Sequence, residues 1–551
     1  MAHNAKHLIF CTLLTMLVAG CSENPSDTSS TATGDLATSA ISTISTISTT
    51  AEGIITTKHG PVRGFVEDGV NVFKGIRYGA DTQTTRFRDP QPPAAWQSPQ
   101  NATSYGPSCP QAPRGQLSLF KSWAPQPDPG MSEDCLFLNV WTPAADDKPR
   151  PVMVWLHGGG FSSGSGSSNV YDGVRLVNRG DVVVVSVNHR LNIFGYLYLD
   201  NHGEQFQGSG NAGMMDLVMA LEWVRDNIAQ FGGDPNNVMI FGESGGGWKV
   251  TTLMAMDSAK GLFHRAVAQS GPALDLTEPA AAAAATTALL TELELNAEDI
   301  ESILTLPTDK LLAAAGKVVS QGIRVAGQPV VDNIHLHRHP FEPDAPSQSA
   351  DVPLMIGSLQ TELSLLVGAG NRELFDLTWK TLPAALEIAI KGIDSNAVIA
   401  GYRKLHPEID APNLFFEATT DNSVFGRGSF TLADRKATSG GAPVYQYYMT
   451  WRTPVEGGKW GATHALDLGF VFDNVAKSES MSGKGQEQQR LADVMSEAWL
   501  AFARSGNPNH PGLPEWPQYD SKTRATMVFD NKLQVINDPR GRERAILDAA
   551  L

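Results

Sequence analysis

The chain has 551 residues, of which 42% are hydrophobic and 18% charged, which is ordinary for a large globular enzyme and ample for a buried core. Its formal net charge is −16, with acidic and basic residues interspersed. This balance argues against nucleic acid as a partner and mainly favours solubility.

Residues 1–20 are predicted to be a lipoprotein-type signal peptide. Lys6 precedes an apolar run, Leu8 to Val18, which is too short to span a bilayer and has the length of a signal-peptide core. The run ends in small residues that lead into Cys21, which resembles the bacterial lipoprotein signal, where the cysteine is lipidated. We therefore expect export to a bacterial membrane, with a lipid anchor at Cys21 as the only membrane contact. An ordinary secretory signal with a chance cysteine is the alternative.

A Ser/Thr-rich segment, residues 21–52, follows the signal and contains an Ile-Ser-Thr triplet repeated three times. It cannot bury a core, so it is predicted to be a flexible tether before a single domain at 53–551. Of the four cysteines, Cys109 and Cys135 remain after Cys11 and Cys21 are assigned to the signal and the anchor. In an exported protein this pair predicts a disulfide.

The folded sequence begins near Gly53, and turn residues between short apolar runs up to Tyr78 predict antiparallel hairpins. Beyond Cys135, strands that read as buried on both faces alternate with helices. The strands are expected at 152–156, 182–187, 238–241, 265–270, 353–357 and 443–449, and the helices at 214–230, 280–318 and 488–504. Repeated β-α-β units of this kind predict an α/β fold with a mostly parallel central sheet flanked by helices.

A candidate nucleophile follows the strand at 238–241, in Gly242-Glu-Ser-Gly-Gly246. The glycines of this G-x-S-x-G pattern suit a strained strand-to-helix turn, because a Cβ there would collide with neighbouring backbone. Such a turn presents the Ser244 hydroxyl at a helix N-terminus. The pattern is short and also occurs by chance in glycine-rich chains. It indicates a catalytic serine only if the chain also supplies a base, an acid and oxyanion donors.

A serine hydroxyl needs a base to remove its proton, and the base needs an acid to hold it. In an α/β-hydrolase these follow in the order Ser, acid, His. His464 lies in a loop after the strand that ends near Met449, which favours it as the base. His406 and His510 are the alternatives, both beside a proline in what read as surface turns.

The candidate acid is Glu362, which comes shortly after the strand at 353–357. Asp332 and Asp351 are alternatives, although Asp351 precedes that strand and so lies at the wrong end of the sheet. The oxyanion needs backbone N–H donors, and the glycine-rich turn His157-Gly-Gly-Gly-Phe161, directly after a predicted strand, is of the type that supplies them.

Two long segments then carry a resemblance to a known family. Residues 231–246 resemble the serine signature of the type-B carboxylesterases, which include cholinesterases and bacterial para-nitrobenzyl esterases, and Glu133 to Pro143 resembles the second signature of that family. The resemblance extends over about residues 53–551. It implies an α/β-hydrolase fold and a serine carboxylester hydrolase that cleaves small-molecule esters through an acyl-enzyme intermediate, with no metal or organic cofactor.

The resemblance also implies a role for each matching residue. The expected triad is Ser244, Glu362 and His464; the oxyanion donors are Gly159, Gly160 and Gly245; Cys109 and Cys135 match the first disulfide of the family; and Glu243, Ser270 and Asp467 match groups around the triad. The alternatives are an amidase or carbamate hydrolase with the same triad, and a non-catalytic binding or adhesion protein of the same fold. The sequence does not indicate an oligomeric state.

The helix after the serine departs from the family pattern. Gly245 stands where the family more often has alanine, and Trp248 and Lys249 stand where it more often has small residues and a serine. The Lys249 side chain is expected to reach the surface, with an approach to one of the acids around the triad as the alternative.

Overall fold

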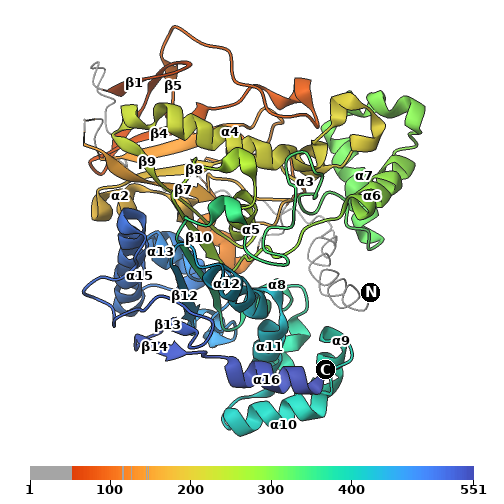
Figure 1. The fold of residues 1–551 in the computed structure, drawn as a ribbon, viewed down its shortest axis with the longest axis vertical. Helices are drawn as coiled ribbons and strands as arrows, with labels where there is room; N and C mark the ends of the chain where they lie inside the picture. The colour runs from red at the N-terminus through yellow and green to blue at the C-terminus, as the bar shows by residue number, and fades with distance from the viewer. Residues whose placement is uncertain (1–52, 114–116, 126, 144–145, 147) are drawn as a thin grey trace, which may run out of the picture.

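The computed structural model describes residues 53–113, 117–125, 127–143, 146 and 148–551 (Figure 1). The predicted signal peptide, the tether and the Cys21 anchor lie outside these residues. Among the residues that are described, no helix combines the length and the apolarity needed to cross a membrane.

An eleven-stranded sheet forms the centre of the molecule, with helices on both faces (Figure 1). Across the sheet the strands are β14 (Gln534–Asn537), β13 (Ala525–Phe529), β12 (Val444–Met449), β11 (Leu354–Leu359), β10 (Arg265–Gln269), β9 (Gly233–Glu243), β7 (Arg150–Leu156), β8 (Val183–Val187), β6 (Phe137–Thr142), β4 (Val70–Arg77) and β3 (Phe65–Glu67). The seven neighbouring strands β13, β12, β11, β10, β9, β7 and β8 pair in parallel. The outer strands at both edges pair antiparallel. The predicted mostly parallel sheet is therefore confirmed.

Each face of the sheet has its own hydrophobic core, because successive side chains of a strand point to opposite faces. Val154 and Ile240 pack in one core with Leu217 and Leu221 of α4. Their strand neighbours, such as Trp155, pack in the other core with side chains of α2, α13 and α15. The parallel strands are buried on both faces, which explains their nearly continuous apolar sequences.

The helices connect the strands or extend beyond the sheet. They are α2 (Val174–Gly180), α3 (Asn192–Tyr196), α4 (Ala212–Asn227), α5 (Gly245–Leu253), α6 (Pro279–Glu292), α7 (Thr308–Ser320), α8 (Glu362–Leu366), α9 (Leu382–Ala389), α10 (Ser395–Leu405), α11 (Ala411–Asn422), α12 (Ser429–Thr438), α13 (Leu468–Val471), α14 (Glu479–Ser482), α15 (Gln486–Ser505) and α16 (Gly541–Ala550). The insertion predicted at 280–318 contains α6 and most of α7, which pack together with α3 beside the sheet (Figure 1).

The N-terminal hairpins predicted before Tyr78 are present. The strands β1 (Ile54–Thr57) and β2 (Gly60–Arg63) pair antiparallel, and β5 (Gln100–Asn101) adds to β2 in parallel to complete a small second sheet. The strands β3 and β4 form the second hairpin, which lies at the edge of the large sheet.

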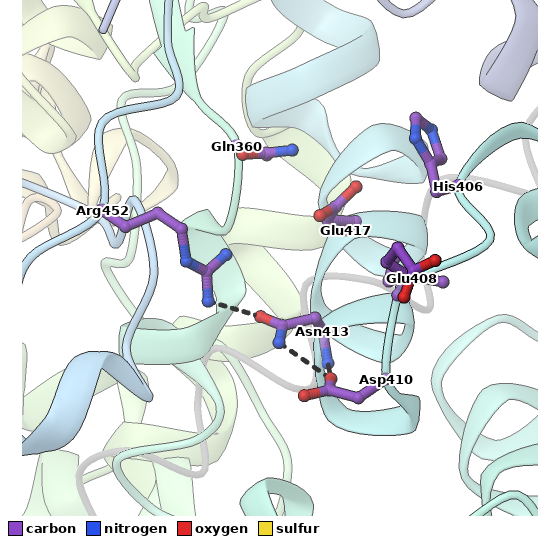
Figure 2. Close-up of a pocket in the computed structure, with 8 residues that line it drawn as sticks. Gln360, His406, Glu408, Asp410, Asn413, Glu417 and Arg452 are labelled. Carbon is purple, nitrogen blue, oxygen red and sulfur yellow. Dashed lines mark hydrogen bonds between the residues drawn. The ribbon is translucent and has the colours of Figure 1, made fainter. Parts of the chain in front are cut away.

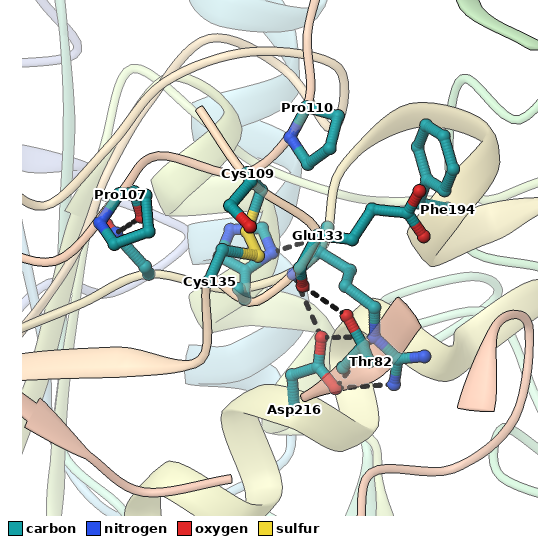
Figure 3. The surroundings of a disulfide bond; sticks show 12 residues. Thr82, Pro107, Cys109, Pro110, Glu133, Cys135, Phe194 and Asp216 are labelled. Atoms are coloured by element: carbon teal, nitrogen blue, oxygen red, sulfur yellow. Dashed lines mark hydrogen bonds and ion pairs between the residues drawn. A yellow bond between two sulfur atoms is a disulfide. The ribbon is translucent and has the colours of Figure 1, made fainter. Parts of the chain in front are cut away.

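The predicted disulfide joins Cys109 to Cys135, just before β6 (Figure 3). Two residues after Cys109, the buried side chain of Gln111 makes a pair of hydrogen bonds with the backbone of Gly164. Its Nε2 donates to the Gly164 carbonyl at 2.9 Å, and its Oε1 accepts from the Gly164 N–H at 2.9 Å. The disulfide thus constrains the segment that binds Gly164, just beyond the glycine-rich loop that follows β7.

Candidate active site

Ser244 lies at a sharp turn between β9 and α5, with φ 57° and ψ −124°. This backbone conformation is strained for a residue with a Cβ, and such strain is common at nucleophile turns. An added Cβ at Gly242 would lie 2.5 Å from the Gly246 carbonyl carbon, and one at Gly246 would lie 2.0 Å from the Leu156 carbonyl oxygen. Glycine is therefore required at both positions for the turn to form.

His464 and Glu362, which are about a hundred residues apart in the sequence, meet at the carboxyl end of the sheet. The Nδ1 atom of His464 lies 2.5 Å from Oε2 of Glu362, and both side chains are buried. The other carboxylate oxygen of Glu362 accepts from the Ser270 hydroxyl at 2.6 Å and from the Leu359 N–H at 2.7 Å. With its oxygens held in this way, Glu362 fixes the tautomer of His464 and leaves Nε2 without a proton when the ring is neutral.

Nε2 of His464 points toward the serine turn, where it lies 3.1 Å from Oε1 of Glu243. The edge of the Phe425 ring packs against the imidazole, with centroids 5.1 Å apart. Within the described residues, the Ser244 hydroxyl has no hydrogen bond to His464 or to another group. Catalytic hydrogen bonds are often long without substrate and tighten when the substrate is bound, so this geometry is compatible with proton transfer.

The buried charges around His464 perturb one another strongly. Burial alone would lower the pKa of His464, but Glu243 and Glu362 stabilise its protonated form and raise the pKa to about 9. Burial raises the pKa of Glu243 to about 8, against the attraction of His464. Strongly perturbed acids and bases in one buried cluster are typical of catalytic sites.

Asp467 is a third buried carboxyl group in this cluster, and burial raises its pKa to about 6. Its Oδ2 atom accepts from Gln269 Nε2 and from the Tyr447 hydroxyl, each at 2.9 Å. Neither Gln269 nor Tyr447 was predicted from the sequence. Gln269 could have been proposed, because it directly precedes Ser270 at the end of β10. The contact of Tyr447 on β12 with Asp467 could not be predicted, because the sequence does not show which face of the sheet that side chain occupies.

The glycine-rich loop after β7 packs against the serine turn. An added Cβ at Gly158 would lie 3.0 Å from the Glu243 carbonyl oxygen and 3.3 Å from the Ser244 Cβ. Gly159 and Gly160 have φ values of 90° and 62°, which glycine adopts without strain. In the described part of the chain, the N–H groups of both glycines lack a protein acceptor, so they are available to an oxyanion.

The prediction that Lys249 reaches the surface is wrong. Its side chain is fully buried, and Nζ donates to the carbonyl oxygens of His157 at 3.0 Å and Gly160 at 2.8 Å. The alternative, an approach to an acid around the triad, is supported electrostatically: burial raises the pKa of Glu243, and the attraction of His464 and Lys249 opposes that rise. These hydrogen bonds of Lys249 are to carbonyl groups. The helix brings Lys249 to the loop because residues four apart lie on the same face as Gly245, which touches Gly160.

The alternative bases lie apart from this cluster. His406 lines a separate polar recess of about 240 Å³ with Glu417 and Arg452 (Figure 2), and its Nε2 atom lies 2.7 Å from Glu543. His510 contacts the carbonyl oxygen of Val494 through Nε2, at 3.1 Å.

The alternative acids are also engaged elsewhere. Asp332 accepts a hydrogen bond from Asn211 at 2.8 Å, and Asp351 is an exposed residue before β11. Among the described residues, no group of three or more His, Cys, Asp and Glu side chains is arranged to hold a metal ion.

Comparisons with known proteins find relatives over most of the chain. A model of the carboxylesterase family matches residues 51–546. The para-nitrobenzyl esterase of Bacillus subtilis (strain 168) is 37% identical over 500 residues, which cover 89% of this chain and 97% of that protein. The crystal structure of a Geobacillus stearothermophilus carboxylesterase at pH 6.2 is 38% identical with a TM-score of 0.78, over 90% of this chain and 100% of that one. An esterase from anaerobic Clostridium hathewayi, described as able to hydrolyze aliphatic aromatic polyesters, is 33% identical with a TM-score of 0.77, over 90% and 98%.

Proposed function

The chain belongs to the carboxylesterase family and is a carboxylic ester hydrolase, and from that premise we propose that Ser244, His464 and Glu362 form its catalytic triad. The observation that carries the proposal is the 2.5 Å contact between His464 Nδ1 and Glu362, which leaves Nε2 directed at the serine turn. Family membership supports the same three residues, because they occupy the order and the loops that a serine hydrolase requires.

In the proposed mechanism, His464 Nε2 takes the proton of Ser244 as its oxygen attacks the ester carbonyl carbon. The carbonyl oxygen becomes an oxyanion, which receives hydrogen bonds from the N–H groups of Gly159, Gly160 and Gly245. His464 then gives its proton to the leaving alcohol, and the acyl group remains on Ser244. Water attacks this acyl-enzyme by the same steps, and the carboxylic acid leaves.

The surrounding groups support these steps. Ser270 and the Leu359 N–H hold the carboxylate of Glu362, while Glu243 and Asp467 stabilise positive charge on His464. The N–H of Gly245 lies at the N-terminus of α5, where the partial positive charge of the helix favours an anion.

The test is the Ser244→Ala variant, assayed with a short-chain p-nitrophenyl ester. We expect hydrolysis to fall to the background rate while the circular dichroism spectrum is unchanged. A fluorophosphonate probe should label the wild type at Ser244 and fail to label the variant. Full activity of Ser244→Ala would contradict the proposal, and a matched amide substrate assayed in parallel measures how far the site favours esters.

We also propose that the chain is exported and anchored in a bacterial membrane through lipid on Cys21. The support is the apolar run from Leu8 to Val18, followed by small residues and a cysteine, and a family match that begins only at residue 51. Labelled palmitate should enter the full-length protein, which should be recovered with membranes. Cys21→Ser should remove both the label and the membrane association, and labelling of that variant would contradict the anchor.

A further inference from the structure

The glycine-rich loop lies across one face of α5. Gly246 packs against the first residue of the loop, His157. Three further residues of α5 contact the loop: Gly245, Trp248 and Lys249, which are spaced three and four apart and so share a face of the helix. Gly245 touches the backbone of Gly160, and the Trp248 ring stacks on Phe161 with centroids 6.1 Å apart and planes inclined by 15°. Two of these three residues, Trp248 and Lys249, are where the sequence departs most from the family pattern.

Lys249 connects the two ends of the loop. Its Nζ atom donates to the carbonyl oxygens of His157 and Gly160, at 3.0 and 2.8 Å, and lies 5.2 Å from the centroid of the Phe161 ring. The side chain has no exposed surface. A buried ammonium is costly unless hydrogen bonds compensate for its lost hydration, so these contacts hold the loop firmly.

The bonded carbonyl groups determine where the loop N–H groups point. A peptide group is planar and trans, so fixing a carbonyl also fixes the N–H of the next residue. The Gly158 carbonyl lies 2.8 Å from His157 Nδ1, and the Gly159 carbonyl accepts from the Ser163 N–H at 3.1 Å. These two bonds orient the N–H groups of Gly159 and Gly160, and Lys249 fixes the peptide groups on either side of them.

Gly245 allows the loop to come this close. An added Cβ at residue 245 would lie 2.1 Å from the Gly160 carbonyl oxygen, the same oxygen that Lys249 binds. A side chain here would push the loop outward and lengthen the lysine contact. The glycine and the lysine therefore form a matched pair.

We propose that Lys249 is a positioning residue of the oxyanion hole, which acts by clamping the carbonyl groups of His157 and Gly160 against α5 so that the Gly159 and Gly160 N–H groups are aimed at the developing oxyanion. The proposal rests on the proposed function, because it gives these N–H groups a role in ester hydrolysis. Lys249 does not touch the substrate. Its effect is therefore on the transition state more than on substrate binding.

The main test is Lys249→Met, which keeps the length of the side chain and removes its donors. We expect kcat for a p-nitrophenyl ester to fall about 10- to 100-fold, less than the loss of a whole oxyanion donor, while KM changes less than about threefold. The affinity for a trifluoromethyl ketone, which forms a tetrahedral adduct with the serine, should fall in parallel with kcat/KM. If Lys249→Met does not fold, Lys249→Gln, which retains a neutral donor, should show a smaller loss of the same kind.

The chain offers a matched control in Lys436. This lysine is also fully buried, and it donates to the carbonyl oxygens of Ser349 at 2.6 Å and Ala350 at 2.9 Å, in a different loop. Lys436→Met removes the same chemistry without touching the glycine-rich loop. It should lower the melting temperature and leave kcat and the ketone affinity unchanged.

A double-mutant cycle tests the pairing with Gly245. Gly245→Ala alone should lower kcat, because the loop must move away from the helix. In the Lys249→Met background the clamp is already lost, so Gly245→Ala should lower kcat by a smaller factor. The loss of kcat in the double variant should therefore be smaller than the product of the losses in the two single variants. Independent losses would contradict the paired arrangement.

The proposal and the triad fail in different ways. If Ser244→Ala keeps its activity, the proposed function is wrong. If Ser244→Ala is inactive but folded Lys249→Met retains kcat and ketone affinity, the triad stands and the clamp is wrong. If the activity lost in Lys249→Met is fully explained by a smaller amount of folded protein, the clamp is also wrong.

Discussion

Carboxylates gather around His464, whereas the glycine-rich loop is held by the ammonium of Lys249. We call the first group, His464 with Glu243, Glu362 and Asp467, the base side, and the loop 157–161 with its lysine the oxyanion side. During the reaction the histidine becomes positive and the substrate oxygen becomes negative. Each side thus provides fixed groups that suit the charge developing on it.

The two sides also differ in how they are held in place. On the base side, side chains bind side chains, as in the contacts of Ser270 with Glu362 and of Gln269 with Asp467. On the oxyanion side, most of the bonded groups are backbone carbonyls. Substitutions on the base side should therefore change protonation, whereas those on the oxyanion side should change backbone geometry.

Among the changes that distinguish the two sides, Glu362→Gln should have the largest effect. The amide can donate to Nδ1 and thereby stabilise the wrong tautomer of His464, so we expect kcat to fall about 10³- to 10⁴-fold. Stopped-flow or endpoint assays with a p-nitrophenyl ester measure this loss. Glu362→Asp keeps the carboxylate, so its kcat should fall less. Equal losses of kcat in the two variants would mean that the loss comes from altered packing and not from the tautomer of His464.

On the oxyanion side, Gly159→Ala should lower kcat about 10²-fold. The backbone of Gly159 has φ 90°, which alanine does not adopt without strain, so the loop and its N–H donors must shift. The pH dependence of kcat/KM should keep its shape, because no titrating group is removed. A shifted pH profile in this variant would contradict the expectation that oxyanion-side substitutions leave the pKa of His464 unchanged.

Glu243→Gln should have a smaller effect on the maximal rate and a clear effect on pH dependence. The base must be deprotonated, so activity is lost as the pH falls through the pKa of His464, which Glu243 helps to raise to about 9. Removing this charge lowers that pKa and should move the acid limb of kcat/KM to lower pH by about one unit or more. Glu243→Asp retains the charge and is the control; an unchanged limb in Glu243→Gln would contradict the assignment.

The smallest effect should come from Asp467→Asn. Asp467 also raises the pKa of His464, but it is the weakest of the charges that do so. The acid limb should therefore move in the same direction as in Glu243→Gln, by less than about one pH unit. A larger shift than that of Glu243→Gln would reverse the order of the two carboxylates.

Much of the fold was predictable because its strands are buried on both faces. Runs such as Val183–Val187 are apolar except for one serine, and they lie where they were expected. The helix α11 was not predicted, since almost all of its side chains are buried, including Glu417 and Asp421, which pair with Arg540. A buried helix with paired polar groups has no amphipathic period to detect.

The site was predictable to the extent that chain order and strand ends determine it. Glu362 and His464 were chosen as candidates because each follows a strand of the parallel sheet, and the structure places the two side chains in contact at that edge. The direction of Lys249 was not predictable, because its partners lie about ninety residues earlier, in a loop whose distance from α5 depends on Gly245. Periodicity along one helix carries no information on a contact of this kind.

The disulfide between Cys109 and Cys135 supports the loop that carries the oxyanion donors. It constrains the segment that contains Gln111, whose side chain makes two hydrogen bonds with the backbone of Gly164. Gly164 in turn packs against His157, the first residue of the glycine-rich loop, because an added Cβ there would lie 2.2 Å from the imidazole. The alignment of the oxyanion donors is thus linked to the oxidation state of two cysteines that precede the loop in the sequence. A chain in which these cysteines are reduced lacks this covalent support for the segment that binds Gly164.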